Sequence, residues 1–423
     1  MPGSGLRAAL VSVVLAGLVV PAPPSGAHEA PAERAGALRP DGGPHHRALA
    51  YVAELHSDSV SVIDTRTGGV VDTVPVGSGP DSVAVAPDGS RAYVTDSGAD
   101  TVSVVDTRRR EVVDTVPVGD EPSRVAVSPD GRRAYVANVA SDDVSVIDTR
   151  RNRVVDTVDV GDAPLGLAFL PDGSRLYVAS AGSNEVWVVG THRHRVVGTV
   201  PVGEGPTALA VAPSGSRVYV TNLTSGDVSV VDTRREEVVA TVAVGEGPAG
   251  VTVLPDGRRV YVANTVSGDV SVIDTHRDEV VDTVPVGREP NGIAVTPDGS
   301  RVYVTDFADD EVSVISTRRD RVVGTVEVGD GPTGVAISPA TKGTFRRSGR
   351  NAPPPGRPGT ACRVTGVPGG RRSRIRSTRS SGGFAVRLPP GPRPTERPYG
   401  APPPPAPDTA ARSPSARGRP WRS

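Results

Sequence analysis

The sequence predicts an all-β fold, a seven-bladed β-propeller made of four-stranded antiparallel blades. Two observations predict it. Tyrosine recurs seven times at a constant spacing of 42 residues, from Tyr51 to Tyr303, and each of these tyrosines is followed by valine. The repeat is also rich in valine and turn residues, and a period of about 40–50 residues with that composition is typical of a propeller in which one repeat forms one blade. Seven repeats therefore predict seven blades.

Each repeat predicts four short strands, which we call A to D. In the second repeat, residues 83–85 are a short apolar strand A, and the Pro-Asp-Gly-Ser turn that follows combines the fixed φ of proline with the free φ of glycine. Residues 92–95 form strand B. Residues 101–106 alternate with period two as strand C, and residues 112–118 form strand D.

Strand D is expected to be the outer edge of each blade. Proline, aspartate, alanine or glutamate stands at one recurring position near its end, and proline or a charge inside a strand is tolerated at an edge, where no ladder hydrogen bond is lost. Strand A is then expected to line the central channel. The prolines at this position are Pro75, Pro117, Pro201 and Pro285.

The two ends of the repeat array complement each other. The array begins at Tyr51 with a strand B that has no strand A before it, and it ends at residues 334–339 with a strand A that has no strand B after it. We therefore expect the C-terminal strand to close the ring as the inner strand of the N-terminal blade. Closure leaves neither terminal blade with an uncovered face.

The repeated text resembles the YVTN family of β-propeller repeats, which occur mostly in surface-layer-like and other exported microbial proteins. The signature reads Tyr-Val-Thr followed by Asp or Asn at residues 93–96, 219–222 and 303–306, with Val-Ser-Val-Ile-Asp-Thr at 60–65 and 144–149. The resemblance covers residues 51–340. It implies the propeller fold, but it brings no shared catalytic residue with it.

The segments outside the repeats differ in composition from the repeat array. Residues 1–27 are interpreted as a signal peptide, because an arginine precedes an apolar run of about 13 residues and small residues follow it. The run is shorter than the roughly 20 residues needed to span a bilayer. Residues 28–48 are expected to be a disordered leader. We therefore expect an exported protein whose propeller occupies residues 49–340, secreted or at the cell surface and not membrane-spanning after signal cleavage.

Residues 341–423 form a tail rich in proline, glycine, serine and arginine, with 18 basic residues and two acidic ones. Three interpretations remain open: a basic arm that binds anionic polymer, inert disorder, or text from a shifted reading frame. The last interpretation is suggested by the basic residues of the chain, which are all arginine except Lys342. This usage is typical of a GC-rich gene, in which a shifted reading frame yields text rich in arginine, proline and glycine. The only cysteine, Cys362, excludes an internal disulfide.

Charge is expected to separate between the two faces of the ring. In an antiparallel meander the B–C and D–A loops share one face, and the A–B and C–D turns share the other. The first set is rich in carboxylates and the second in arginines, so we predict an acidic and a basic binding surface. Duplication of one solvated loop explains the same pattern without any binding. The acidic candidates are Asp96, Asp100, Asp142, Asp143, Glu185, Asp227, Asp269, Asp309 and Asp310, and the basic candidates are Arg108, Arg109, Arg150, Arg151, Arg318 and Arg319.

Other repeated polar residues are interpreted as structural. The aspartate that ends strand C, as in Asp106, precedes a turn and is expected to cap it by an Asx-type hydrogen bond. The strands that line the channel are apolar, with Asp81 and Arg124 near its mouth. His192 and His194 in the fourth repeat lie beside arginines, and neither has the further ligands that a metal needs. We predict no catalytic residue, no metal site and no cofactor.

The sequence therefore favours a non-enzymatic propeller that acts as a binding or interaction scaffold at or outside the cell surface. The expected partner is a protein or a cell-wall polymer and not nucleic acid, and the expected state is a monomer. The alternative is a lactonase-like hydrolase or lyase that holds a metal on the acidic loop face.

Overall fold

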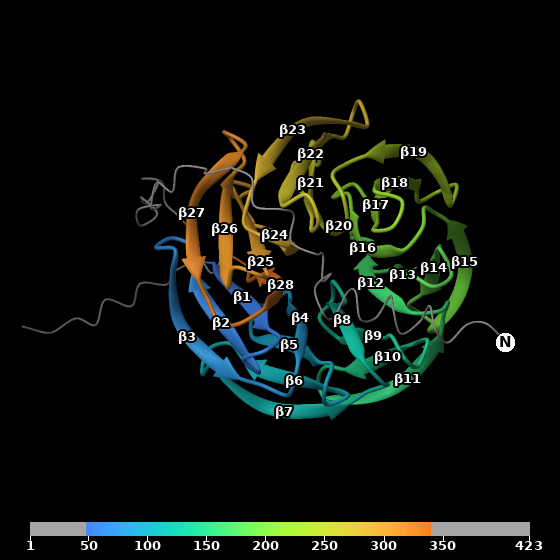
Figure 1. The fold of residues 1–423 in the computed structure, drawn as a ribbon. Helices are drawn as coiled ribbons and strands as arrows, with labels where there is room; N and C mark the ends of the chain where they lie inside the picture. The colour runs from blue at the N-terminus through green and yellow to red at the C-terminus, as the bar shows by residue number, and fades with distance from the viewer. Residues whose placement is uncertain (1–47, 340–423) are drawn as a thin grey trace, which may run out of the picture. The chain divides into compact units, whose positions relative to one another are not determined.

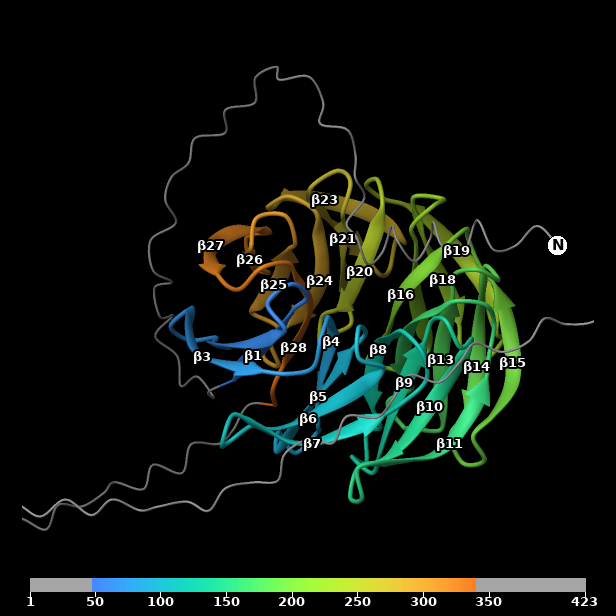
Figure 2. The same ribbon diagram turned by 60° about the horizontal axis from the view of Figure 1, so that its bottom comes forward.

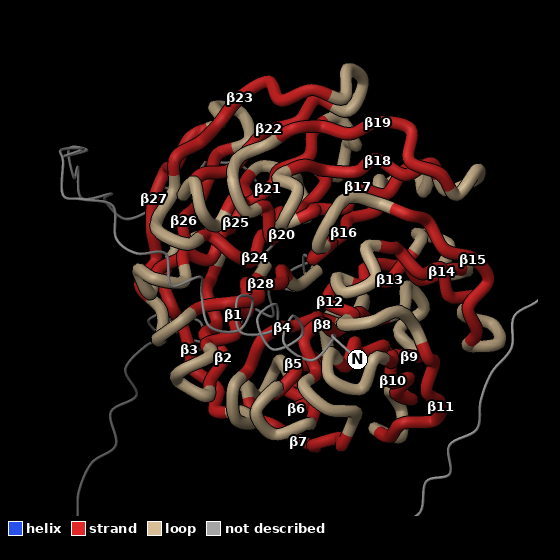
Figure 3. The backbone as a smooth tube through the Cα atoms, turned by 45° about the vertical axis from the view of Figure 1, so that its right-hand side comes forward, coloured by secondary structure: helices blue, strands red, loops and turns tan. Residues whose placement is uncertain are grey.

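The computed structural model describes residues 48–339, which form seven sheets around a central axis (Figure 1). The predicted signal peptide, the leader up to residue 47, and the tail with Lys342 and Cys362 lie outside the described residues. Figure 3 shows the described chain as strands joined by short loops. Within this part of the chain, no helix is long and apolar enough to cross a bilayer.

The predicted four strands are present in every blade. The inner strands, predicted as A, are β4 (Pro80–Val85), β8 (Pro122–Val127), β12 (Pro164–Phe169), β16 (Pro206–Val211), β20 (Pro248–Val253), β24 (Pro290–Val295) and β28 (Pro332–Ile337). The second strands, predicted as B, are β1 (Leu49–Glu54), β5 (Arg91–Asp96), β9 (Arg133–Asn138), β13 (Arg175–Ser180), β17 (Arg217–Asn222), β21 (Arg259–Asn264) and β25 (Arg301–Asp306).

The two remaining strands of each blade follow in chain order. The third strands, predicted as C, are β2 (Ser59–Asp64), β6 (Thr101–Asp106), β10 (Asp143–Asp148), β14 (Glu185–Gly190), β18 (Asp227–Asp232), β22 (Asp269–Asp274) and β26 (Glu311–Ser316). The outer strands, predicted as D, are β3 (Gly69–Pro75), β7 (Glu111–Pro117), β11 (Arg153–Asp159), β15 (Arg195–Pro201), β19 (Glu237–Ala243), β23 (Glu279–Pro285) and β27 (Arg321–Glu327).

The ring closes as the sequence predicts. Strand β28 pairs antiparallel with β1, with Tyr51 opposite Ala336 and Val52 opposite Val335, so the first sheet has the order β28-β1-β2-β3. Figure 2 shows β28 beside β1 although the two strands come from opposite ends of the array. The backbone amide of Ser338 also donates to the carbonyl of Leu49 at 2.8 Å. The N-terminal blade is therefore completed by the C-terminal strand.

The hydrophobic core is divided among the seven interfaces between adjacent blades. Each of the seven larger core clusters in the described residues combines side chains of two neighbouring sheets. Alternate residues of one strand face opposite neighbours: Tyr51 packs towards the second blade, whereas Ala50 and Val52 pack towards the seventh. All seven tyrosines are at most 1 % exposed. The period of two thus places every second and third strand in two interfaces at once.

The outer strands have the exposure expected of an edge. In β7 the residues are mostly exposed except Val116, and the terminal Pro117 is exposed. The prediction that the recurring proline marks the outer edge is confirmed, because Pro117 is the last residue of a strand that pairs only with β6.

The inner strands begin three residues earlier than the sequence indicates. In β4, Pro80 pairs with Asp96, and the register then shifts before Ser82 pairs with Thr95. The hydroxyl of Thr95 accepts the Ser82 amide at 2.9 Å and donates to the Ser123 carbonyl of the next blade at 2.8 Å. A side-chain oxygen therefore replaces the ladder hydrogen bond at the irregularity, so the strand can continue to Pro80 without an unpaired buried amide.

Ring closure gives the first prediction. Truncation after Gly329 removes β28, so β1 becomes an inner edge with unpaired backbone groups. The truncated chain should melt at a clearly lower temperature than the full chain. Truncation after Phe345 keeps β28 and should change the free energy of unfolding by no more than about 0.5 kcal/mol, the scale of a surface change. Equal melting temperatures for the two truncated chains in the same buffer would show that closure is unimportant.

Candidate functional site

The two loop sets lie on opposite faces of the ring, as the antiparallel order of each sheet requires. We call the face made by the B–C and D–A loops the acidic loop face, and the face made by the A–B and C–D turns the basic turn face. The predicted site residues are considered face by face below, because exposure and hydrogen bonding decide which of them are available to a partner.

Asp96 does not belong to the exposed acidic surface. It is the last residue of β5 and is 0 % exposed. Its carboxylate accepts hydrogen bonds from the Ser103 hydroxyl at 2.7 Å, the Thr101 hydroxyl at 2.9 Å and the Gly77 amide at 3.1 Å. Burial raises the pKa of Asp96, and these hydrogen bonds oppose that shift. The residue thus ties its own blade to the preceding D–A loop.

Three further acidic candidates pair with the residue that replaces Asp96 in other blades. Asparagine takes that position at Asn138, Asn222 and Asn264, each fully buried. In each case the amide Nδ2 donates to the carboxylate five residues later, at 2.6 Å. These carboxylates are half-buried and engaged in the B–C loop. They belong to Asp143, Asp227 and Asp269.

Three more carboxylates hold the adjoining D–A loop. Asp100, Asp142 and Asp310 have φ values of 54°, 56° and 56°, a left-handed conformation that aspartate tolerates. Each accepts a backbone amide of the D–A loop 21 residues later, at 2.9–3.0 Å. Asp309 instead forms an ion pair with Arg288, with 2.6 Å between Oδ1 and Nε. Of the nine acidic candidates, only Glu185 has no hydrogen bond or ion pair within the described residues.

Eight of the nine acidic candidates are therefore structural ties, whereas D–A loop carboxylates such as Asp120, Glu204 and Glu246 are exposed. In residues 48–339 no three histidine, cysteine, aspartate or glutamate side chains approach closely enough to hold a metal ion. A carboxylate that accepts a backbone amide is fixed in position by the loop, although it keeps its negative charge and further lone pairs.

The basic candidates are differently placed. Arg108, Arg109, Arg150, Arg151, Arg318 and Arg319 are all exposed on the C–D turns. Within the described residues, the only ion pairs among them are 3.5 Å contacts of Arg109 with Glu111 and of Arg151 with Asp148. Exposed ion pairs of this kind contribute little. Most of these guanidinium groups are thus available to a partner.

In five of the seven blades the third strand ends in an aspartate that fixes the following turn; in the fourth and seventh blades it ends in Gly190 and Ser316. Asp106 accepts the backbone amides of Arg108 and Arg109 at 3.0 and 2.9 Å, and these hydrogen bonds lower its pKa. The Asx-type role predicted for this residue is confirmed. The cap fixes the backbone of the turn, and the side chains of Arg108 and Arg109 are exposed.

A second group of arginines is structural. The first residue of the second strand is half-buried and reaches the C–D turn of the next blade: Arg175 pairs with Glu236, Arg217 with Asp278 and Arg259 with Asp320, at 2.5–2.7 Å. The acidic partner is 61 residues further along in each case. Sequence reasoning missed these pairs, although the constant spacing was visible in the sequence.

His194 occupies the corresponding turn position in the fourth blade. Its Nδ1 lies 2.7 Å from the hydroxyl of Tyr135 in the preceding blade. Burial lowers the pKa of His194, which favours the neutral ring. The histidine therefore forms a contact between blades. At the equivalent place in the seventh blade, the carboxylate of Asp320 accepts the hydroxyl of Tyr261 at 2.6 Å.

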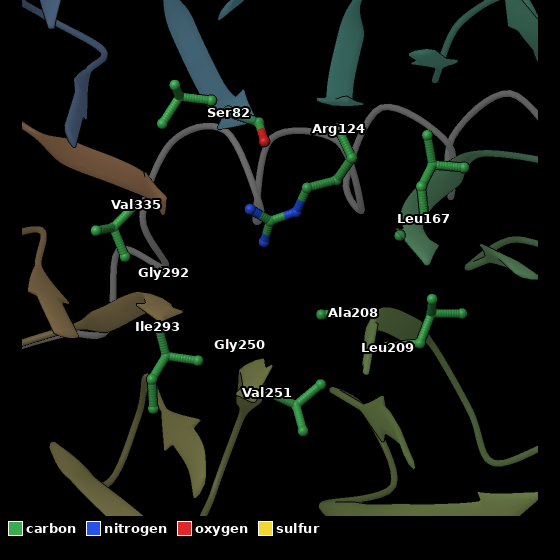
Figure 4. A pocket seen from close by; sticks show the side chains of 12 residues that line it. Ser82, Arg124, Leu167, Ala208, Leu209, Gly250, Val251, Gly292, Ile293 and Val335 are labelled. Carbon is green, nitrogen blue, oxygen red and sulfur yellow. The ribbon is translucent and has the colours of Figure 1, made fainter. Parts of the chain in front are cut away.

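The central channel holds a cavity of about 150 Å³ lined mainly by apolar and small residues (Figure 4). Arg124 points into it, and Asp81 on the neighbouring strand β4 is the only other ionisable residue in the seven inner strands. Burial raises the pKa of Asp81 to about 6, and the positive charge of Arg124 opposes the rise. The two opposite charges on adjacent strands partly offset each other.

The fold and its loop faces define a seven-bladed β-propeller built from one repeat. The sequence matches the model of the YNCE-like β-propeller family over residues 32–125 and 251–340, which agrees with the resemblance to YVTN repeats. No curated protein matches the sequence significantly.

Solved structures share the fold. The hydrazine synthase of Kuenenia stuttgartiensis is 25% identical over 60% of this chain and 88% of that chain, with a TM-score of 0.56. A functionally unknown protein of Desulfotomaculum acetoxidans and a putative 6-phosphogluconolactonase of Bacteroides uniformis are each 18% identical over 69% of this chain and 99% of theirs, with TM-scores of 0.63 and 0.61. The last two similarities show the fold alone.

The buried polar position of Asp96 gives the second prediction. Its equivalent Asp306 is 1 % exposed, and burial raises its pKa from 3.8 to about 7, against a 2.6 Å hydrogen bond from Ser313 and with the charge of Asp309 adding to the rise. The folded protein thus binds this proton more tightly than the unfolded chain. Stability should therefore fall as pH rises from about 4 to about 7.

Asp306→Asn should remove this loss, because the amide can donate to Glu311 opposite it in β26. At pH 8 we expect the variant to be more stable than the wild type by at least about 1.4 kcal/mol, the equivalent of one pKa unit. Urea unfolding at pH 5 and pH 8 measures this. Asn264→Asp is the reciprocal control and should be destabilised at pH 8; a wild type and an Asp306→Asn variant with the same pH dependence would contradict the assignment.

Proposed function

We propose that this propeller is a non-enzymatic interaction scaffold that acts outside the cell and binds an anionic partner, a cell-wall polymer or an acidic protein surface, through its basic turn face. The observation that carries the proposal is the contrast between the faces. Eight of the nine acidic candidates make side-chain hydrogen bonds or an ion pair, whereas Arg108, Arg150, Arg318 and Arg319 are exposed and make no ion pair within residues 48–339.

The geometry of the basic turn face suits an extended partner. Five of the seven C–D turns are capped by the same aspartate, and every C–D turn carries at least one arginine. Neighbouring cationic groups attract a polyanion at several points at once, and their fields add within the 8–10 Å or so that salt permits. Binding of this kind needs no deep cleft, and it should weaken steeply as salt rises.

The third prediction concerns this face. Arg318→Gln with Arg319→Gln removes two unpaired charges, and exposed ion pairs contribute about 0.2–1 kcal/mol each, so affinity should fall roughly 2- to 30-fold. The measurement is retention of the full-length protein on a purified anionic cell-wall fraction across a sodium chloride series.

Two variants control for net charge. Arg288→Gln makes the same type of substitution on the acidic loop face, and Glu185→Gln changes the net charge by one in the other direction there. Neither should alter retention. Wild-type protein that is not retained, or a loss that is equal per charge for Arg288→Gln and the basic-face variant, would contradict the proposal.

Export is the second part of the proposal and rests on residues 1–27. The fourth prediction is that the protein isolated from the culture medium or cell surface begins at His28, after cleavage at the small residues Ser25 to Ala27. N-terminal sequencing of the isolated protein measures this. Protein found only inside the cell, with Met1 or Pro2 at its N-terminus, would argue against export.

A further inference from the structure

Three blade interfaces share an arginine–carboxylate pair, and at the interface between the second and third blades the arginine is present but the carboxylate is not. Arg91 opens β5, at the position that Arg175, Arg217 and Arg259 take in their own blades. Those three pair with an acidic residue 61 positions later, but the residue 61 positions after Arg91 is Asn152. At this interface, between the second and third blades, the neutral amide of Asn152 replaces the carboxylate.

The remaining two arginines of this series also have partners. Arg133 pairs with Asp148 of its own blade at 2.8 Å, and Arg301 donates to the carbonyl of Thr65 at 2.9 Å. The Nη1 atom of Arg91 is buried and has no hydrogen-bond partner within the described residues. A buried guanidinium donor without an acceptor is unfavourable, because its lost hydration is not replaced.

Asn152 does not supply the missing acceptor. It has a left-handed φ of 48°, like Glu236 and Asp278 at the equivalent turns, but its Nδ2 donates to Asp114 of the preceding blade at 2.9 Å. Its own Oδ1 is also buried without a partner. A neutral amide oxygen would in any case supply no negative charge to Arg91.

Arg91 lines a pocket of about 430 Å³ on the basic turn face, between the A–B turns of the second and third blades. That volume lies within the range typical of small-ligand sites, about 300–1,000 Å³. Arg150, which is exposed and unpaired, and Arg132 line the same pocket, with Tyr93 and Thr149 as further polar neighbours. Three guanidinium groups therefore border one hollow.

The two carboxylates of the pocket are committed to their own turns. Asp88 accepts the hydroxyl and the amide of Ser90 at 2.7 and 2.9 Å. Asp130 accepts the hydroxyl of Ser128 at 2.6 Å and the amide of Arg132 at 3.0 Å, and lies 3.8 Å from the Arg132 guanidinium. Neither carboxylate forms an ion pair with Arg91 or Arg150. The pocket thus keeps two cationic side chains that form no ion pair within the described residues, although Asp106 is opposite Arg91 in β6.

We propose that this pocket is a binding site for an oxyanion, a phosphate or carboxylate group, held by Arg150 and by Arg91, which lacks the carboxylate partner found at three other interfaces. A planar guanidinium with several N–H donors matches the paired oxygens of such a group. The inference rests on the proposed function in that an anionic partner would present this group, but binding of the small anion can be measured without the partner.

The test uses a substitution that restores the pattern of the other blades. Asn152→Asp places a carboxylate within the turn that serves Arg175, Arg217 and Arg259, so Arg91 acquires an internal partner. Asn184→Asp is the matched control: the residue is also left-handed, with φ 56°, the substitution and its charge are the same, and it lies on the acidic loop face. Arg91→Gln removes the cation itself.

The fifth prediction is measured by calorimetric titration of the full-length protein with inorganic phosphate and, separately, with succinate, against chloride at equal ionic strength. The wild type should bind one equivalent, and the tighter of the two probes identifies the group. Asn152→Asp and Arg91→Gln should each weaken binding at least tenfold, and Asn184→Asp should not. Asn152→Asp should also raise the melting temperature. Phosphate should raise the melting temperature of the wild type but not that of this variant.

The outcomes separate this inference from the proposed function. No binding of either probe beyond that of chloride, or unchanged binding in Asn152→Asp, would overturn the pocket. Loss of polymer retention in the Arg318→Gln and Arg319→Gln variant with intact phosphate binding supports both. Intact phosphate binding without any polymer retention in the wild type would overturn the proposed function and leave the pocket standing.

Discussion

The contact between adjacent blades is the interaction on which the rest of this structure depends. No blade has a core of its own, because the clustered valines and tyrosines of each interface come from two sheets. The residues of the repeated Tyr-Val-Thr signature form that contact. The tyrosine fills the interface and, in Tyr135 and Tyr261, reaches the next C–D turn, whereas the threonine, as Thr95 does, bonds the next inner strand. Such an array is stable only as a closed ring.

The last residue of the signature shows how a buried polar site tolerates variation. Asparagine at Asn138 or Asn264 donates to a carboxylate five residues later, whereas Asp96 accepts from the hydroxyl of Thr101 at that place. Donor and acceptor exchange together, so the hydrogen bond survives. Asp306 is opposite Glu311 with no such exchange; burial raises its pKa, and the charges of Asp309 and Glu311 add to the rise. A buried position can thus vary as long as its partner varies with it.

The sequence was sufficient to predict the fold, because the period, the turn residues and the incomplete repeats at the two ends each constrain the same topology. It was less informative about exposure. Asp96 and Asp100 look alike in the sequence, but one is fully buried and the other caps a loop, since strand β5 extends to include Asp96. The start of β4 at Pro80 was also not predictable, because it depends on a hydroxyl from another strand. Contacts between blades could not be predicted from one repeat, because they depend on how two adjacent blades pack.

Repetition also explains why charge alone is a poor guide to binding in this chain. Aspartates that cap turns recur in five of the seven blades, and carboxylates that accept loop amides recur as well, so both faces accumulate charge for reasons of local geometry. A partner can bind only the charged groups that are not already engaged in turns and loops. On the basic turn face that remainder is a set of arginines held outside their capped turns, and at one interface it is Arg91, whose partner position carries an amide. In a repeat protein, the residues that break the pattern therefore say more about recognition than those that keep it.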